Sequence, residues 1–327
     1  MSTPAANTTP AQREADARGI QFHYDLPPAF FQLFLDPTMC YSCHYFLTAE
    51  DSLAEAAINK WELAARKIGL ARDDRVLDVG VGWGSFVLWA ASQHGCRTTG
   101  ITLSQIQADY VRANAEALGV ADLVDVQVMH ANAMTFPEGS FDKIVSFDTI
   151  EHIADLDGLF RDCRRLLRND ARSCMLVQGS MAPATARADT HQPHVSGEAS
   201  FIREYIFPVG EHPELGNVIR SLEAGGFEVV DVENLTDHYT RTLQHWYRNF
   251  MKHVGDLGAA TGVSPERFRA HVLFLAGSVE GLSENQILCY QTLVRPIDVY
   301  QPRRELPATR RGLLLDCHVA NQPGGDP

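Results

Sequence analysis

Val76-Leu77-Asp78-Val79-Gly80-Val81-Gly82-Trp83-Gly84-Ser85 is the stretch that decides the fold, because an apolar strand turns there into a loop with glycine at every second position. Glycine has no Cβ, so it accepts positive φ and lets the backbone approach a ligand closely. The stretch therefore predicts a strand, a ligand-binding turn and a following helix. A strand-to-helix turn without a ligand is the simpler alternative.

Two cofactors suit such a loop, a nicotinamide dinucleotide and S-adenosylmethionine (SAM). The dinucleotide fold requires G-x-G-x-x-G, with the diphosphate at a helix N-terminus. Here Gly84 comes one residue early, and Ser85 stands where that pattern expects glycine. Asp78 would repel a diphosphate but would attract the sulfonium and α-ammonium groups of SAM. The charge therefore favours SAM.

Strands alternate with helices on both sides of this loop. Strands are predicted at residues 75–79, 97–101, 124–129, 143–147, 173–179, 227–232 and 286–294, and helices at 52–68, 86–94, 104–118, 156–167, 215–224 and 240–254. The alternation predicts an α/β fold, with a mostly parallel seven-stranded sheet and helices on both faces. In such sheets the ligand binds at the carboxyl ends of the strands.

The chain divides into six predicted regions. They are a disordered leader (1–18), an N-terminal helical cap (19–70) with an amphipathic helix from Asp25, a SAM-binding Rossmann-like core (71–182), a lid loop and substrate-binding segment (183–255), a C-terminal helix with the last strand (256–300), and a loosely held tail (301–327). The loop at 182–199 has no periodicity, which is typical of a substrate lid or of an exposed linker.

Composition argues against several classes of protein. The formal net charge of −13 argues against a nucleic-acid partner. Seven scattered cysteines, and no N-terminal run like a signal peptide, predict a cytoplasmic protein. Cys40 and Cys43 form a C-x-x-C, but no second pair follows at zinc-site spacing, so we expect no metal site. Peripheral contact with a membrane or an acyl carrier, and a homo-oligomer, stay open.

Several separated segments together resemble one family. They are HYDLPPAFFQLFLDPTMCYSCHYF (23–46), LDVGVGWGS (77–85), GITLSQIQ (100–107), IEH (150–152), FIREYIFPVG (201–210) and HYTRTLQHWYRNF (238–250). Over residues 21–296 the chain resembles the cyclopropane fatty acid synthase and mycolic acid cyclopropane synthase family of SAM-dependent C-methyltransferases. The resemblance implies a class I SAM-methyltransferase fold with an added helical and aromatic substrate lid.

The resemblance also implies a set of cofactor-binding residues. Thr102 and Gln107 are expected to supply the polar contacts that an acidic residue makes in most class I methyltransferases, because the second strand here ends in Gly-Ile-Thr. Met134 would offer a polarizable surface to the adenine, or would fill the core. The full set is Tyr41, Ser42, Asp78, Gly80, Gly82, Gly84, Thr102, Leu103, Gln107, Asn132, Ala133 and Met134.

The catalytic residues follow from the same resemblance. Family members of the cyclopropane type hold bicarbonate as a base, through a cysteine backbone, a glutamate, a histidine with a nearby isoleucine backbone, and a tyrosine. Three of these positions carry over as Cys43, Glu151 and Tyr239, whereas Gln178 and Ser180 replace the histidine and the isoleucine. Glutamine donates hydrogen bonds but cannot take up a proton. Either bicarbonate is bound more weakly here, or Glu151 is the base.

We therefore expect a SAM-dependent C-methyltransferase that acts through a carbocation on the double bond of an unsaturated acyl chain or isoprenoid, giving a cyclopropane or a methyl-branched product. The alternatives are a small-molecule N-methyltransferase and a SAM-binding protein without transferase activity. A short pocket with Arg203 or Arg241 would indicate an anionic head group. Five aromatic residues are expected to stabilise a cation or to line a lipid channel or core, namely Tyr45, Phe201, Tyr205, Tyr239 and Trp246.

Overall fold

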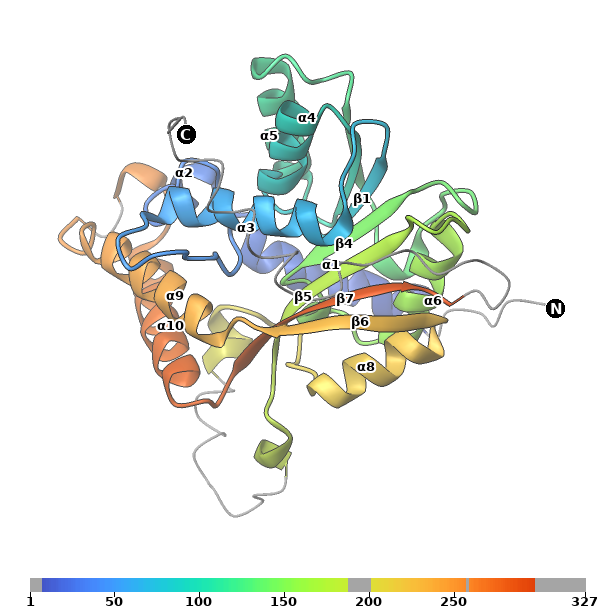
Figure 1. Ribbon diagram of the computed structural model, residues 1–327. Helices are drawn as coiled ribbons and strands as arrows, with labels where there is room; N and C mark the ends of the chain where they lie inside the picture. The colour runs from blue at the N-terminus through green and yellow to red at the C-terminus, as the bar shows by residue number, and fades with distance from the viewer. Residues whose placement is uncertain (1–7, 188–200, 257–258, 298–327) are drawn as a thin grey trace, which may run out of the picture.

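A seven-stranded sheet forms the centre of the computed structural model, which describes residues 8–187, 201–256 and 259–297 (Figure 1). The strand order is β3-β2-β1-β4-β5-β7-β6, and only β7 runs antiparallel to its neighbours. This confirms the predicted α/β fold. The strands are β1 (Arg75–Val79), β2 (Arg97–Thr102), β3 (Val124–Val128), β4 (Lys143–Phe147), β5 (Cys174–Met181), β6 (Phe227–Asn234) and β7 (Leu288–Pro296).

Helices cover both faces of the sheet because successive strand residues point to opposite sides. Val76 and Val145 pack with α3, α4 and α5, whereas Leu77 and Ile144 pack with α6 and α8. Figure 1 shows α3 on one side of the sheet and α8 on the other. The bounds are α3 (Leu53–Ile68), α4 (Ser85–His94), α5 (Gln105–Ala117), α6 (Leu156–Leu166) and α8 (Leu215–Ala224).

The helix predicted at residues 52–68 is confirmed, and its end signals explain its bounds. Ser52 accepts a hydrogen bond from the Glu55 backbone N–H, and the Glu55 side chain accepts one from the Ser52 backbone in return. This reciprocal capping box satisfies donors that the first turn leaves unpaired. The helix ends at Gly69, whose φ of 59° is left-handed and suits glycine.

A third, aromatic layer packs at one end of the sheet. It contains α2 (Pro28–Phe31), α9 (Thr236–Met251) and α10 (Pro265–Ser283). The predicted length of the amphipathic helix from Asp25 is wrong, because α2 has only four residues. Asp36 accepts a hydrogen bond from the Thr38 backbone and stabilises a turn instead.

The expectation of a disordered leader is wrong from Pro10 onward. Helix α1 (Pro10–Tyr24) begins there, with Thr9 capping its first turn and proline at its first position. The sequence did not reveal α1 because the helix has no apolar stripe. It packs through small and polar residues instead, and a Cβ on Gly19 would lie 2.5 Å from the Val209 side chain. Residues 1–7, most of the predicted lid loop (188–200) and the predicted tail (301–327) lie outside the described residues.

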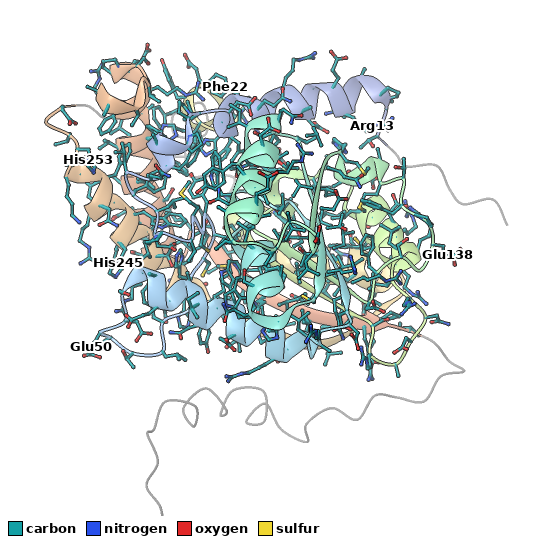
Figure 2. All side chains as sticks on the ribbon, turned by 90° about the horizontal axis from the view of Figure 1, so that it is seen from above. Arg13, Phe22, Glu50, Glu138, His245 and His253 are labelled. Atoms are coloured by element: carbon teal, nitrogen blue, oxygen red, sulfur yellow. The ribbon has the colours of Figure 1, made fainter. Side chains whose placement is uncertain are left out.

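Figure 2 shows α1 between its labels Arg13 and Phe22. The Phe22 end of α1 contacts α10, because the Arg267 guanidinium lies 4.0 Å from the centre of the Phe22 ring. The described residues also form short 3-10 helices, namely η1 (Ala131–Ala133), η2 (Ile150–His152), η3 (Ala184–Arg187) and η4 (Ala259–Thr261). Within the described ranges, no helix is long and apolar enough to cross a membrane.

Candidate functional site

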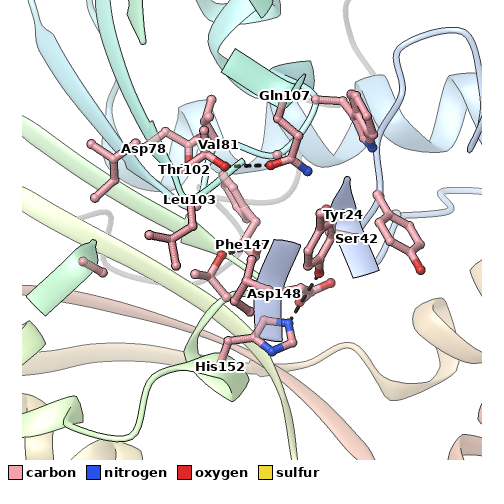
Figure 3. A pocket seen from close by; sticks show the side chains of 18 of the residues that line it. Tyr24, Ser42, Asp78, Val81, Thr102, Leu103, Gln107, Phe147, Asp148 and His152 are labelled. Atoms are coloured by element: carbon pink, nitrogen blue, oxygen red, sulfur yellow. Dashed lines mark hydrogen bonds between the residues drawn. The ribbon is translucent and has the colours of Figure 1, made fainter. Parts of the chain in front are cut away.

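A cavity lies at the carboxyl ends of β1, β2 and β4, where the order of the sheet reverses (Figure 3). Its empty space, including the opening to solvent, is about 990 Å³. This is the edge at which open α/β sheets bind their ligands. Eight of the predicted cofactor residues line it, namely Tyr41, Ser42, Asp78, Gly80, Gly82, Thr102, Leu103 and Gln107.

The glycines of the loop have different structural tasks. Gly82 has φ 53°, and a Cβ built on it would meet no atom of the described chain within 4 Å, so its backbone faces the open cavity. Gly84 has φ 81° and precedes α4, and its Cβ would lie 2.6 Å from the Val111 side chain of α5. Gly84 does not line the cavity. Its smallness lets α4 and α5 pack closely.

Asp78 lies at the end of β1 and is almost fully buried. Its Oδ1 atom accepts no hydrogen bond from any residue that the structure describes. Burial raises the pKa of Asp78 to about 7, against the opposing effect of the nearby Lys60 ammonium. Lys60 itself donates to the Ser42 hydroxyl. A buried carboxyl oxygen without a partner is costly, so this position suits a cationic ligand group.

Thr102 and Gln107 lie at the end of β2 and in the first turn of α5. The Thr102 hydroxyl donates to the Gln107 Oε1 atom over 2.7 Å, which Figure 3 marks with a dashed line. The Ser104 backbone N–H donates to Thr102 over 3.1 Å. The pair thus holds the Gln107 amide against the cavity wall, where its nitrogen is a donor for a ligand.

Helix α1 supplies part of the wall, which the sequence did not predict. Asp16, Ile20 and Tyr24 line the cavity. The Tyr24 hydroxyl lies 3.4 Å from His152 Nε2, as Figure 3 shows. The Gln21 amide donates to the Leu103 carbonyl over 2.9 Å and ties α1 to the end of β2.

Three residues that directly precede the loop expected beside the adenine line the cavity. The cavity is lined by Met129, His130 and Ala131, not by Asn132, Ala133 and Met134. The Asn132 amide donates to the Asp155 carbonyl over 2.9 Å. Met134 is buried in the hydrophobic core with residues of α6, which agrees with the alternative that this side chain fills the core.

Asp148 joins two of the predicted catalytic residues and is not among the residues predicted from the sequence. The Cys43 backbone N–H donates to Asp148 Oδ2 over 2.8 Å. The Gln178 amide donates to Asp148 Oδ1 over 3.2 Å. Asp148 also lines the cavity, whereas Cys43 and Gln178 do not. A sequence signal was present, because a carboxylate directly after the strand at 143–147 lies at the ligand-binding edge of the sheet.

Glu151 and Tyr239 complete this group. Glu151 lies in η2, and its Oε1 atom accepts a hydrogen bond from the Ser180 backbone. Burial, and next the negative charge of Asp148, raise the pKa of Glu151 to about 8. Burial raises the pKa of Tyr239 well above its usual value, and Asp148 adds to this effect. Neither residue lines the cavity, but both lie close enough to Asp148 to feel its charge.

The other aromatic and basic candidates lie elsewhere. Phe201 and Tyr205 stack on each other with ring centres 5.3 Å apart. Arg203 pairs with Glu211, and Arg241 donates to backbone carbonyls at residues 48 and 49. None of the five predicted aromatic residues and neither arginine lines the cavity. Its aromatic wall consists of Tyr24, Tyr41, Trp61, Trp83, Phe86 and Phe147.

Comparison with known proteins agrees with this geometry. A family model described as mycolic acid cyclopropane synthetase matches residues 11–292. A probable fatty acid methyltransferase of Pseudomonas putida is 35% identical, over 92% of this chain and 74% of that protein. Sphingolipid C9-methyltransferase 1 of Gibberella zeae is 30% identical over 86% of this chain. The match covers only 54% of that longer relative.

A solved structure is similar to this chain over most of the length of both. The mycolic acid cyclopropane synthase CmaA1, complexed with S-adenosylhomocysteine (SAH) and CTAB, gives a TM-score of 0.78 at 32% identity. The match covers 85% of this chain and 97% of that one. These findings confirm the resemblance and exclude the dinucleotide interpretation of the glycine loop. The chain belongs to the mycolic acid cyclopropane synthetase family, and it is a SAM-dependent methyltransferase.

Proposed function

We propose that this enzyme transfers the methyl group of SAM to the double bond of an unsaturated acyl chain. The observation that carries the proposal is the charge of the cavity. Three carboxylates line it, from Asp16, Asp78 and Asp148, and no lysine or arginine of the described residues does so. Such a wall attracts a cationic cofactor and repels a diphosphate or a free carboxylate head group.

The residues present fit SAM, which supplies an electrophilic methyl group on a sulfonium when it is bound. Asp78 would hold the α-ammonium, since its buried oxygen accepts no bond from the described residues. Gln107 and Thr102 would hold the ribose hydroxyls, and Gly82 lets the loop backbone approach the cofactor. Met129 and Ala131 are the apolar wall residues nearest in sequence to the loop expected at the adenine.

The chain's own residues would then position the alkene and protect the cation that forms. An alkene is a weak nucleophile, so much of the rate enhancement must come from alignment and exclusion of water. The aromatic wall provides both, because its rings are rigid and their faces stabilise positive charge. Asp148 places a carboxylate at the same cavity.

The names of the relatives support a lipid substrate. One is a fatty acid methyltransferase and another a sphingolipid methyltransferase, and the structure of CmaA1 contains CTAB. Together with the acidic wall, these names favour an acyl chain over a prenyl diphosphate. An acyl chain is presented on a phospholipid or on a carrier, so contact with one of these surfaces belongs to the proposal.

The experiment incubates the protein with methyl-labelled SAM and four acceptors: an unsaturated phospholipid, an unsaturated acyl carrier thioester, a prenyl diphosphate and a small tertiary amine. We expect label in one of the two acyl acceptors, with a mass gain of one methylene, because the cation loses a proton whether it closes a ring or forms a branched alkene. Label in the amine alone would establish N-methyl transfer instead. Transfer to none of the four would contradict the proposal, provided that calorimetry shows SAM binding.

A further inference from the structure

The bicarbonate site of the cyclopropane-type relatives does not fit this chain. Its expected donors include the Cys43 backbone, the residue at 178 and the backbone at Ser180. All three donate to carboxylates of the protein itself: Cys43 and Gln178 to the two oxygens of Asp148, and Ser180 to Glu151. A separate anion would have to displace these contacts and lie beside the Asp148 carboxylate.

Asp148 is held firmly in this position. Its backbone N–H donates to the Gln178 carbonyl over 2.9 Å, and its φ of 49° is left-handed, a conformation that aspartate tolerates better than most residues. The unusual backbone turns the carboxylate toward the Cys43 N–H and into the cavity wall.

A buried chain of hydrogen bonds fixes the direction of the Gln178 amide. The Lys67 ammonium can only donate, and it donates to the Gln291 oxygen over 2.7 Å. The Gln291 nitrogen must therefore point toward Gln178, and it donates to the Gln178 oxygen over 3.1 Å. This leaves the Gln178 nitrogen to donate to Asp148. Glutamine at position 178 thus suits a fixed carboxylate as its partner.

We propose that Asp148 takes the place of bicarbonate and is the catalytic base, an inference that rests on the proposed methyl transfer to an alkene. The alkene π electrons form the new bond to the transferred methyl carbon, and the pair of the broken C–S bond stays on sulfur. The other alkene carbon becomes cationic. An Asp148 oxygen then takes a proton from the new methyl group, and the released C–H pair closes the three-membered ring.

Glu151 is less suited to this task. Glu151 is not among the residues that line the cavity, whereas Asp148 is. Since burial and Asp148 raise the pKa of Glu151 to about 8, this group keeps its proton at neutral pH and does not compete for the substrate proton.

The test measures turnover in buffer freed of carbon dioxide and again with added bicarbonate. We expect wild-type turnover to be the same in both. Asp148→Asn keeps the side-chain shape and tolerates the backbone angle, and we expect it to lower kcat by about 100-fold or more. Asp148→Gly also accepts the positive φ and removes the side chain, so added formate or bicarbonate should restore part of its turnover.

The matched control is Asp122→Asn, an exposed aspartate, which should turn over like the wild type. Wild-type turnover that requires bicarbonate, or an Asp148→Asn variant of full activity, would overturn the inference. So would an Asp148→Gly variant that binds SAM normally but that neither anion restores. These results presuppose wild-type methyl transfer, and its absence would contradict the proposed function instead.

Discussion

Two buried carboxyl groups, Asp78 and Glu151, have pKa values raised by burial to about 7 and about 8. Burying each carboxyl group costs stability, and groups with such raised pKa values are common at active sites. Of the two, only Asp78 lines the cavity. Titration of Asp78 should therefore change cofactor binding, whereas titration of Glu151 should change the stability of the fold.

Asp78→Asn should weaken SAM binding by on the order of 100-fold at pH 8, because a charge partner of the α-ammonium is lost. The difference should shrink at pH 6, where the wild-type carboxyl must first release a proton before it binds a cation. Calorimetry at pH 6, 7 and 8 measures both affinities, and their ratio cancels the titration of SAM itself. An equal ratio at every pH would refute this role.

Glu151→Gln should stabilise the fold increasingly as pH rises. Folding raises the pKa of Glu151 from 4.5 to about 8, so the folded state binds the extra proton and wild-type stability falls across this window. The fall is at most about 1.4 kcal/mol per pH unit. Urea unfolding at pH 5, 6.5 and 8 measures it. Glu138→Gln, at an exposed position, is the control. A pH-independent difference between Glu151→Gln and wild type would contradict the expectation.

Among the elements, α1 shows most clearly that the local sequence pattern does not predict every helix. The strands and most helices follow from periodicity, because each buries one apolar face. Helix α1 is mostly polar and gains its place from contacts with distant segments, among them Leu103 and Val209. Its role in the cavity wall therefore depends on tertiary packing.

Gln21→Ala should weaken SAM binding about fivefold with little change in stability. The variant loses the hydrogen bond to the Leu103 carbonyl, a contact worth about 1 kcal/mol that holds α1 over the cavity. Fluorescence titration with SAM, together with thermal unfolding, measures both effects. Arg18→Ala, on the exposed side of the same helix, should leave the affinity unchanged. Equal effects of the two variants would show that the tie to Leu103 does not matter.

For the whole molecule, Lys67 links a helix to the far strands of the sheet. Its ammonium, on α3, is buried and contacts Asp231 and Glu233 of β6 and Gln291 of β7. The same lysine sets the direction of the hydrogen bonds that reach Asp148. Fold stability and the geometry of the site are therefore coupled through one buried cation.

Lys67→Met should lower the free energy of unfolding by about 3–5 kcal/mol, because the partly buried carboxylates of β6 lose their buried lysine. Urea denaturation measures the loss. The exposed Lys252→Met is the control and should change stability by less than about 0.5 kcal/mol. A similar small change at Lys67 would show that the buried network is not structurally important.

Local pattern is sufficient for the sheet, for most helix bounds and for the loop from Gly80 to Gly84, because periodicity and backbone conformation depend on neighbouring residues. The resemblance added Cys43, Glu151, Gln178 and Tyr239, which the fold brings together around Asp148. The hydrogen-bond partners and the pKa shifts of these residues depend on the tertiary structure. The hydrogen bonds that hold Asp148 and Gln178 join residues 105 and 113 positions apart, such as Cys43 with Asp148 and Gln178 with Gln291. Only packing of the whole sheet fixes contacts at such separations, so the sequence could place Asp148 at the ligand-binding edge but could not show that Cys43 and Gln178 hold it there.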